Sequence, residues 1–139
     1  MTWLVWSLLS AFFAAITAIL AKVGVEGVDA NLATAVRTSV VVIFTWLLAL
    51  LVRPPKAFQL FTPRTWMFLA LSGIATGLSW LCYFHALKAG PASRVAPIDK
   101  LSVALVIAFA ALFLGEGLTW GKGIGGLLIV AGAITIALD

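Results

Sequence analysis

Charged side chains are scarce in this sequence. Asp, Glu, Lys and Arg together make up 10% of its 139 residues, whereas an average soluble domain contains about 25%. Hydrophobic residues account for 63% of the chain, and its mean hydropathy is +1.17. Such a composition predicts an integral membrane protein with the lipid bilayer as its surroundings, organised as a single membrane domain over residues 1–139.

Reactive and metal-binding side chains are equally rare. The chain has one His, His85, and one Cys, Cys82, and its most closely spaced carboxylates, Glu26 and Asp29, lie in a short linker. A zinc site normally needs three or four clustered ligands, and a single Cys excludes an internal disulfide. We therefore expect no metal, no cofactor and no catalytic residues, and we predict that the protein is not an enzyme.

Two patterns that suggest other functions have simpler explanations. The net charge is +4, but the nine Lys and Arg residues are scattered singly at predicted helix ends, so no nucleic-acid partner is expected. The sequence GKGIGG over residues 121–126 matches the dinucleotide-binding fingerprint, but that motif requires a preceding strand. We interpret the basic residues as topology signals and the glycines as helix-packing positions.

Five apolar stretches are long enough to cross a bilayer as helices. They cover about residues 3–22, 32–52, 66–87, 98–114 and 119–138. The first has no basic leader or cleavage site of a signal peptide, so we expect it to be a membrane helix. Asn31 is placed to cap the second. The predicted fold class is all-α, a polytopic membrane protein with five transmembrane helices.

An ionisable pair lies at the head of the fourth apolar stretch. Gly90, Pro91 and Pro97 form a predicted hinge, and Asp99 and Lys100 follow it. Charges entering hydrocarbon usually mark functional sites. Asp99 is expected at a helix start, where the helix dipole favours it, and Lys100 would meet an anionic substrate, a carboxylate or a transferable proton. Alternatively, Asp99 caps the helix and Lys100 snorkels outward.

The third stretch supplies further pathway candidates. Thr76, Trp80 and Tyr83 follow one another at helical steps, and His85 lies close to Lys88. Aromatic side chains can form the walls of a solute pocket, and His can relay protons. All four candidates are also compatible with simple packing against lipid or a neighbouring helix.

Other polar and small residues have structural interpretations. Arg37 lies about one and a half turns inside the second stretch, where it can snorkel to headgroups, pair with an acid or bind an anion. Glu116 is expected to fix the turn before the last stretch or to pair with Lys122. Three glycines of the last stretch can share one helix face for close packing: Gly121, Gly125 and Gly132. Gly126 can share another face with Ala133.

The second half of the chain has a distinctive order of motifs: an aromatic-rich YFHAL segment at 83–87, an AGPASRVAP hinge at 89–97, a helix closed by LGE at 114–116, and a glycine-rich final helix. With these motifs it resembles an EamA-type domain of the drug/metabolite transporter superfamily. The first part also fits, with AKVG at 21–24 and Arg37 early in the second helix. The match spans the whole chain.

This resemblance implies half of a ten-helix transporter. Most members of the superfamily carry two such domains in opposite orientations around a substrate pathway, whereas this chain has one. Four Lys or Arg residues lie at one predicted membrane face and three at the other, and such balance permits insertion in both directions. The resemblance therefore implies a transporter protomer in the bacterial cytoplasmic membrane, moving a small metabolite or drug-like solute by alternating access as an antiparallel homodimer.

Two alternatives stay open. The chain is an obligate subunit of a heteromeric exporter or lipid-carrier flippase, paired with a second EamA-type chain, or it is a non-transporting membrane scaffold or assembly factor. A basic residue at the start of the fourth helix also resembles the solute-phosphate branch of the superfamily, where Lys100 would attract an anionic group.

Overall fold

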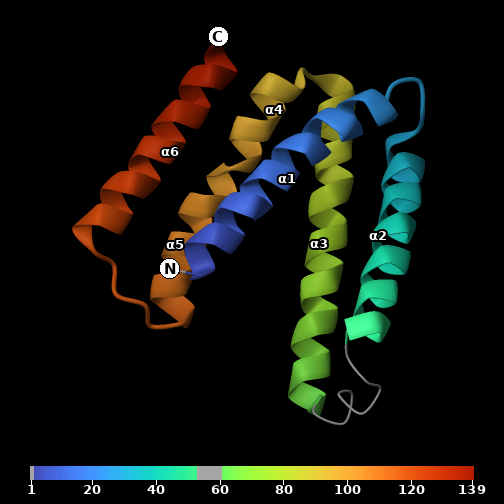
Figure 1. The fold of residues 1–139 in the computed structure, drawn as a ribbon. Coiled ribbons are helices and arrows are strands. Elements are labelled where there is room, and N and C mark those ends of the chain that lie inside the picture. Colours follow the sequence, from blue (N-terminus) through green and yellow to red (C-terminus); the bar gives the residue numbers. More distant parts are fainter. Residues whose placement is uncertain (1, 53–60) are drawn as a thin grey trace. The chain divides into compact units, whose positions relative to one another are not determined.

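The computed structural model describes residues 2–52 and 61–139. Within these ranges every regular element is a helix (Figure 1). The helices are α1 (Thr2–Gly24), α2 (Ala30–Val52), α3 (Pro63–Ala89), α4 (Ala92–Asp99), α5 (Leu101–Phe113) and α6 (Trp120–Leu138). The predicted all-α class is thereby confirmed.

Five helical stretches are long and apolar enough to cross a membrane, as the sequence predicts. Four of them are the single helices α1, α2, α3 and α6, and the remaining one consists of α4 and α5 and runs from Ala92 to Phe113. In the most apolar 18 residues of each stretch, at most 11% of the residues are buried by other parts of the chain. Lipid chains or the helices of a partner must therefore cover most of their surface.

Asp29 caps the start of α2. Its Oδ1 accepts hydrogen bonds from the backbone amides of Asn31 and Leu32, both at 3.0 Å. These amides have no acceptor inside the helix, so a side-chain oxygen just before the first turn stabilises it. The expectation that Asn31 is the cap is wrong, because Asn31 already lies within the helix and its amide is one of the donors.

Threonine side chains begin α3 and α6. Thr62 Oγ1 accepts from the amide of Thr65 at 3.2 Å, and Pro63 occupies the first helical position, where no amide donor is needed. The third span consequently starts three residues before the predicted position of about residue 66. In α6, Thr119 Oγ1 accepts from the amide of Lys122 at 3.3 Å.

The fourth span begins earlier than predicted. Helix α4 starts at Ala92, directly after the Gly90–Pro91 turn, whereas the sequence suggested a start at about residue 98. Pro97 lies inside α4 instead of marking a helix boundary, since proline is better tolerated in membrane helices than in soluble ones. The predicted hinge over 89–97 is therefore confined to Gly90 and Pro91.

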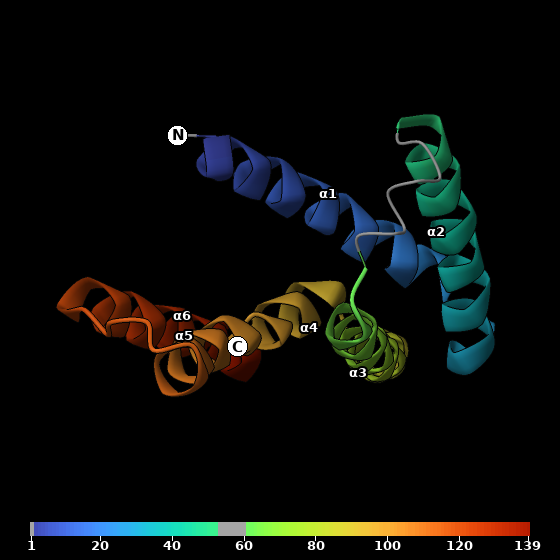
Figure 2. The same ribbon diagram turned by 90° about the horizontal axis from the view of Figure 1, so that it is seen from below.

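The chain divides into two compact units, one formed by residues 1–22 with 89–139 and the other by residues 23–88. In the first unit, α4 and α5 pack on α6, which runs beside them (Figures 1 and 2). Gly126 of α6 is buried, and a Cβ atom placed there would lie 3.4 Å from Ile107 Cδ1. The missing side chain lets α5 and α6 approach closely.

The predicted glycine face of α6 is not the face that packs within this unit. A Cβ atom on Gly125 or Gly132 would meet open space, and one on Gly121 would meet only Thr119 Oγ1, at 4.0 Å. The buried positions of α6 are instead Gly126 and Ala133. Close packing through Gly121, Gly125 and Gly132 stays a prediction.

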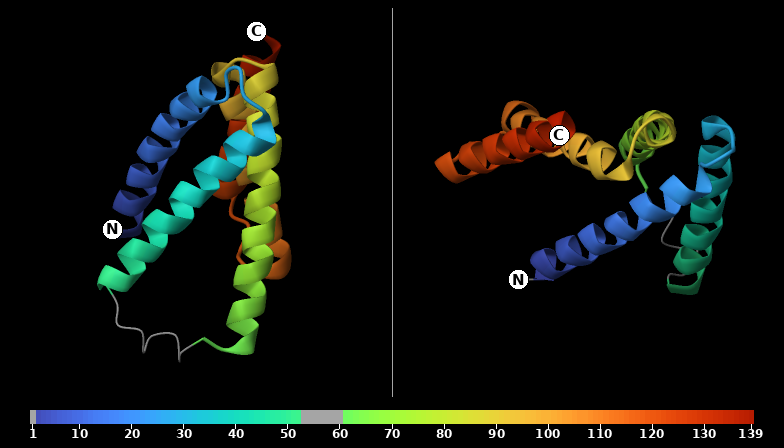
Figure 3. Two further views of the ribbon diagram at one scale, coloured as in Figure 1. Left: turned by 90° about the vertical axis from the view of Figure 1, so that its right-hand side faces the viewer. Right: turned by 90° about the horizontal axis from the view of Figure 1, so that it is seen from above.

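In the second unit, α2 and α3 are near each other where α2 begins and α3 ends, and they separate toward their other ends (Figure 3). The buried residues follow the same course. Ala30 and Thr34 are buried on α2, and Phe84 and Leu87 on α3. Further from the shared end, α2 beyond residue 37 and α3 from residue 66 to residue 79 are exposed.

Candidate functional site

The fourth span is interrupted at Lys100, about 12 Å from its start at 1.5 Å per residue. Lys100 separates α4 from α5 and has φ −72° and ψ −6°. Its amide donates to the carbonyls of Ala96 at 3.3 Å and Pro97 at 3.1 Å. The backbone thus tightens for one turn inside the membrane-spanning segment instead of continuing as a regular α-helix.

Pro97 explains why the interruption lies here. Proline has no amide hydrogen, so the carbonyl four residues earlier, that of Ser93, loses its helical donor, and the proline ring also crowds it. Kinks in helices typically occur at such residues. The break follows within three residues of Pro97.

Asp99 and Lys100 form an ion pair at this break. Lys100 Nζ lies 3.1 Å from Asp99 Oδ2, with 56% of the lysine side chain and 35% of the aspartate side chain exposed. Asp99 is the last residue of α4, so the expectation that it starts a helix and is favoured by the positive end of the dipole is wrong. The pair is neutral as a whole, and the ammonium keeps donors free for a further acceptor.

A second group of candidates lies in the other unit, between α2 and α3. The guanidinium carbon of Arg37 lies 3.4 Å from the centroid of the Trp80 ring. The Trp80 ring in turn contacts Tyr83 edge-on, with centroids 5.5 Å apart, and Phe84 at 6.0 Å. Arg37, Trp80 and Tyr83 are half-buried, and Phe84 is buried.

Thr76 and His85 are each engaged with their own helix. Thr76 Oγ1 donates to the carbonyl of Ser72 at 2.8 Å, and His85 Nδ1 lies 2.8 Å from the carbonyl oxygen of Leu81. Both side chains are exposed. Both hydrogen bonds stay within one helix and point to no solute. The roles of Thr76 and His85 in a solute pathway therefore stay predictions.

The end of α3 also supports the linker before α2. Lys88 Nζ donates to the carbonyl of Val28 at 2.8 Å. The pKa of Asp29 is lowered, chiefly because its carboxylate accepts from the Leu32 amide, with the Asn31 amide and the charges of Lys88 and His85 acting in the same direction. This end of the second unit is thus a polar cluster outside the membrane span.

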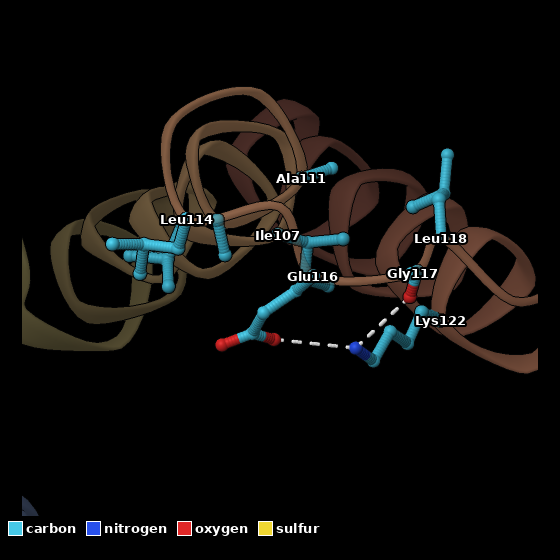
Figure 4. A pocket seen from close by; sticks show the side chains of 9 residues that line it. Ile107, Ala111, Leu114, Glu116, Gly117, Leu118 and Lys122 are labelled. Atoms are coloured by element: carbon cyan, nitrogen blue, oxygen red, sulfur yellow. Dashed lines mark hydrogen bonds and ion pairs between the residues drawn. The ribbon is translucent and has the colours of Figure 1, made fainter.

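The turn between α5 and α6 is held by a second ion pair, Glu116 with Lys122 (Figure 4). Lys122 Nζ lies 3.3 Å from Glu116 Oε2 and donates to the carbonyl of Gly117 at 3.1 Å. Gly115 has φ +67°, a conformation that favours glycine. The expected pairing of Glu116 with Lys122 is therefore present, beside a small hollow of about 210 Å³ that is lined by four apolar residues of α5, by Leu114, Gly117 and Leu118, and by the ion pair itself.

Sequence reasoning missed the pairing of Arg37 with Trp80. Both residues were candidates, but on separate helices, and nothing local to either one indicates the other. A signal is nevertheless present: Arg37 lies seven residues after the start of α2 and Trp80 nine residues before the end of α3. Because α2 and α3 run in opposite directions, the start of α2 and the end of α3 lie at the same end of the unit, and counting from that end places the two residues at similar depth in the membrane. Among the described residues no metal-binding cluster of His, Cys, Asp or Glu occurs.

The fold and these sites define a multi-pass membrane protein of the transporter class, with a broken span and ionisable residues within its helices. The chain belongs to the EamA-like transporter family, whose model matches residues 1–138. The resemblance deduced from the sequence is thereby confirmed. The protein is a membrane transporter, and its bacterial relatives place such proteins in the inner membrane.

Three relatives illustrate the match. A Sinorhizobium protein described as an uncharacterized transporter in the cobO 3' region is 49% identical over 140 residues, which cover 99% of this chain and 97% of the relative. A probable 4-amino-4-deoxy-L-arabinose-phosphoundecaprenol flippase subunit, ArnF, of Erwinia tasmaniensis is 43% identical over 77 residues, covering 53% of this chain and 58% of that subunit. An uncharacterized protein of Methanocaldococcus jannaschii is 33% identical over 69 residues, half of each chain.

These relatives have the length of a single repeat. The Sinorhizobium protein is matched almost end to end, and 77 residues already make up 58% of the ArnF subunit. Single-repeat chains are thus a recurring form among the relatives. No solved structure is a significant match to the chain.

Proposed function

We propose that two copies of this chain, inserted in opposite orientations, form one transporter that moves a small metabolite or drug-like solute by alternating access. The observation that carries this proposal is the interruption of the fourth span beside an ion pair, at Asp99 and Lys100. Transporters commonly bind solutes at discontinuous helices near the membrane midplane, where two inverted repeats meet. Irregular backbone at this depth is tolerated chiefly where it borders a cavity or protein.

The odd number of spans supports opposite insertion. With five crossings, two copies inserted in the same direction cannot reproduce an inverted pair, whereas two copies inserted oppositely do. Among the described residues, Arg64 and Lys122 flank one membrane face and Lys22, Lys88 and Arg94 the other. Arg53 and Lys56 add to the first face in sequence but lie outside the described residues. Such a small difference gives either orientation little advantage.

Lys100 is the proposed solute contact. Its ammonium already has Asp99 as a counter-ion at 3.1 Å, so the pair can remain in the membrane without solute. An anionic group that replaces or joins Asp99 would gain a charge-assisted hydrogen bond, worth about 1.5–3 kcal/mol. Asp99 would then be released to interact elsewhere.

Transport in proteoliposomes tests this assignment. The assay measures the initial uptake of a panel of labelled neutral, anionic and cationic metabolites by the purified single chain. For a solute that the wild type transports, we expect Lys100→Ala to lower flux about tenfold or more and Lys100→Arg to retain part of it. Arg64→Ala, which removes an exposed basic residue at the start of α3, is the matched control and should transport normally.

Two outcomes would contradict the proposal at different points. Unchanged flux in both Lys100 variants would remove Lys100 from the solute pathway. Absence of uptake of every panel member by the wild type would argue against a self-sufficient homodimer.

A second candidate function is favoured by the relative from Erwinia tasmaniensis, which is described as a flippase subunit. By analogy, this chain would pair with a second EamA-type chain and move a lipid-linked substrate. Co-purification separates the two candidates: a tagged chain expressed in its native membrane recovers a different small EamA-type protein under this alternative, and an untagged copy of itself under the homodimer proposal.

A further inference from the structure

The pair Arg37 and Trp80 has features of a binding site that the transport proposal leaves unused. The guanidinium carbon lies 3.4 Å from the indole centroid. Two planar groups can approach this closely only when they lie nearly face to face. The N–H bonds of a guanidinium lie in its own plane, so in this arrangement they run alongside the indole ring and none of them is directed at it.

The donors of Arg37 therefore lack acceptors. Among the residues that the structure describes, no ion pair or hydrogen bond of Arg37 is present; its contact is the stack on Trp80. Guanidinium stays charged in proteins. Cation–π stacking offsets part of the cost of desolvating the charge through one face, but it does not satisfy five N–H donors.

The position of the pair leaves the donor edge accessible. Ala30, Thr34 and Arg37 lie at helical spacing on α2, and the first two are buried while Arg37 is half-buried. Leu87, Phe84 and Trp80 form the corresponding stripe on α3, again with the last residue half-buried. Arg37 and Trp80 thus stand at the inner end of the buried region, next to the exposed parts of both helices.

Depth also argues against simple snorkelling. Arg37 lies about 10 Å along α2 from its first residue, and Trp80 about 13 Å from the end of α3, at 1.5 Å per residue. A snorkelling arginine extends its head toward the headgroups, whereas the stack holds this guanidinium over a ring anchored at similar depth. An acceptor for its donors must therefore reach that depth.

We propose that Arg37, held flat on Trp80, is a binding site for an oxyanion, a phosphate or carboxylate group that inserts between α2 and α3. A planar fork of donors fits both groups in a bidentate manner, and aromatic side chains on α3 provide apolar walls for the body of the molecule. The anion is either the headgroup of an acidic lipid or the charged end of a soluble molecule. The site lies within one chain, so it does not require a dimer. Binding at this site can also be measured whether or not the protein transports the bound molecule.

Direct binding to the purified full chain in dodecyl maltoside tests the proposal, because this detergent contains no phosphate or carboxylate. In one arm, calorimetric titration with phenyl phosphate and with acetate detects a soluble source. In the other, native mass spectrometry detects retention of added phosphatidic acid. Saturable binding in the first arm identifies a soluble ligand, and retention in the second identifies a lipid.

Substitutions of Arg37 separate the role of the planar guanidinium from the role of its positive charge. Arg37→Gln is expected to weaken binding about tenfold to a hundredfold. Arg37→Lys keeps the positive charge but replaces the planar guanidinium, which can donate two parallel hydrogen bonds, by a compact ammonium group. This variant should therefore bind with intermediate affinity. Arg64→Gln is the matched control, since Arg64 lies 5.7 Å from the Phe68 ring at the exposed start of α3, and it should bind like the wild type.

The proposal is overturned if the wild type binds the anion in neither arm, or if Arg37→Gln binds like the wild type. If Arg37→Gln does not fold, Arg37→Lys decides: affinity equal to that of the wild type would show that the stacked fork is not the binding element. Neither readout requires transport, so failure of the transport assay leaves this test intact.

Discussion

Single basic side chains take three different environments in this chain. Lys22 and Lys88 donate to backbone carbonyls, of Gly90 at 3.0 Å and of Val28 at 2.8 Å. Lys100 pairs with its sequence neighbour, and Arg37 stacks on an aromatic ring. Sequence position alone predicts which of them lie deep in the membrane, but the partner of each is set by the fold.

The Asp29 cap gives a prediction at the scale of one residue. Its carboxylate has a pKa below the usual value of 3.8, mainly because of the hydrogen bond from the Leu32 amide. Because the pKa is lower in the folded state than in the unfolded state, the ionised carboxylate stabilises the protein above pH 3.8. This stabilisation is lost as the pH falls through the lowered pKa of the folded state. We expect Asp29→Ala to lower the thermal midpoint in detergent at pH 7.

Asp29→Asn is the control for charge, because asparagine also caps helices but does not titrate. The difference in midpoint between wild type and Asp29→Asn should be largest at neutral pH and should shrink in acid. A difference that stays constant down to the most acid pH at which the protein stays folded would contradict the assigned role of the carboxylate.

Local patterns predicted some of these residues and not others. Glu116 and Lys122 are close in sequence, and their pairing could be anticipated. Arg37 and Trp80 are separated by most of α2, a loop and more than half of α3, so their stacking depends on the angle between the two helices. Asn31 and Asp29 are both good capping residues, and the difference between them depends on the exact first residue of α2, which hydropathy does not determine.

At the scale of helices, hydropathy located every span because each one must expose an apolar surface to lipid. It failed at the start of α4. The sequence predicts a helix boundary at Pro97, as in a soluble protein, yet the helix begins at Ala92 and continues past Pro97. The consequence is functional: Asp99 and Lys100 lie inside the fourth span, at its break, and not at its head.

The contact between α5 and α6 depends on Gly126. Since a Cβ atom there would already lie 3.4 Å from Ile107 Cδ1, a larger side chain forces the helices apart. We expect Gly126→Leu to lower the free energy of unfolding by about 1–3 kcal/mol, the usual cost of overpacking. Chemical denaturation in detergent micelles measures this.

Gly125→Leu is the matched control on the neighbouring position. A Cβ atom at Gly125 meets open space, so within one chain the substitution should leave stability close to that of the wild type. If the glycine face joins two chains, the same variant should reduce crosslinked dimer. Equal destabilisation by both variants would contradict the assignment of Gly126 as the intramolecular contact.

At the scale of the whole molecule, the chain matches the model of its transporter family from residue 1 to residue 138. The number of spans was predictable from composition, and family membership from the motifs of the second half. Assembly is different. Topology depends on a small difference between charges at two membrane faces, and the identity of the second repeat depends on surfaces that a single chain leaves to lipid or to its partner.

The orientation of the termini tests the central proposal most directly. A single cysteine is added at either end on a Cys82→Ser background, and its accessibility to a membrane-impermeant thiol reagent is measured in intact cells. Opposite insertion predicts that each terminus is labelled in a comparable fraction of the molecules. Labelling of only one terminus would show a fixed topology and contradict the antiparallel homodimer, and the inverted repeat would then have to come from another chain.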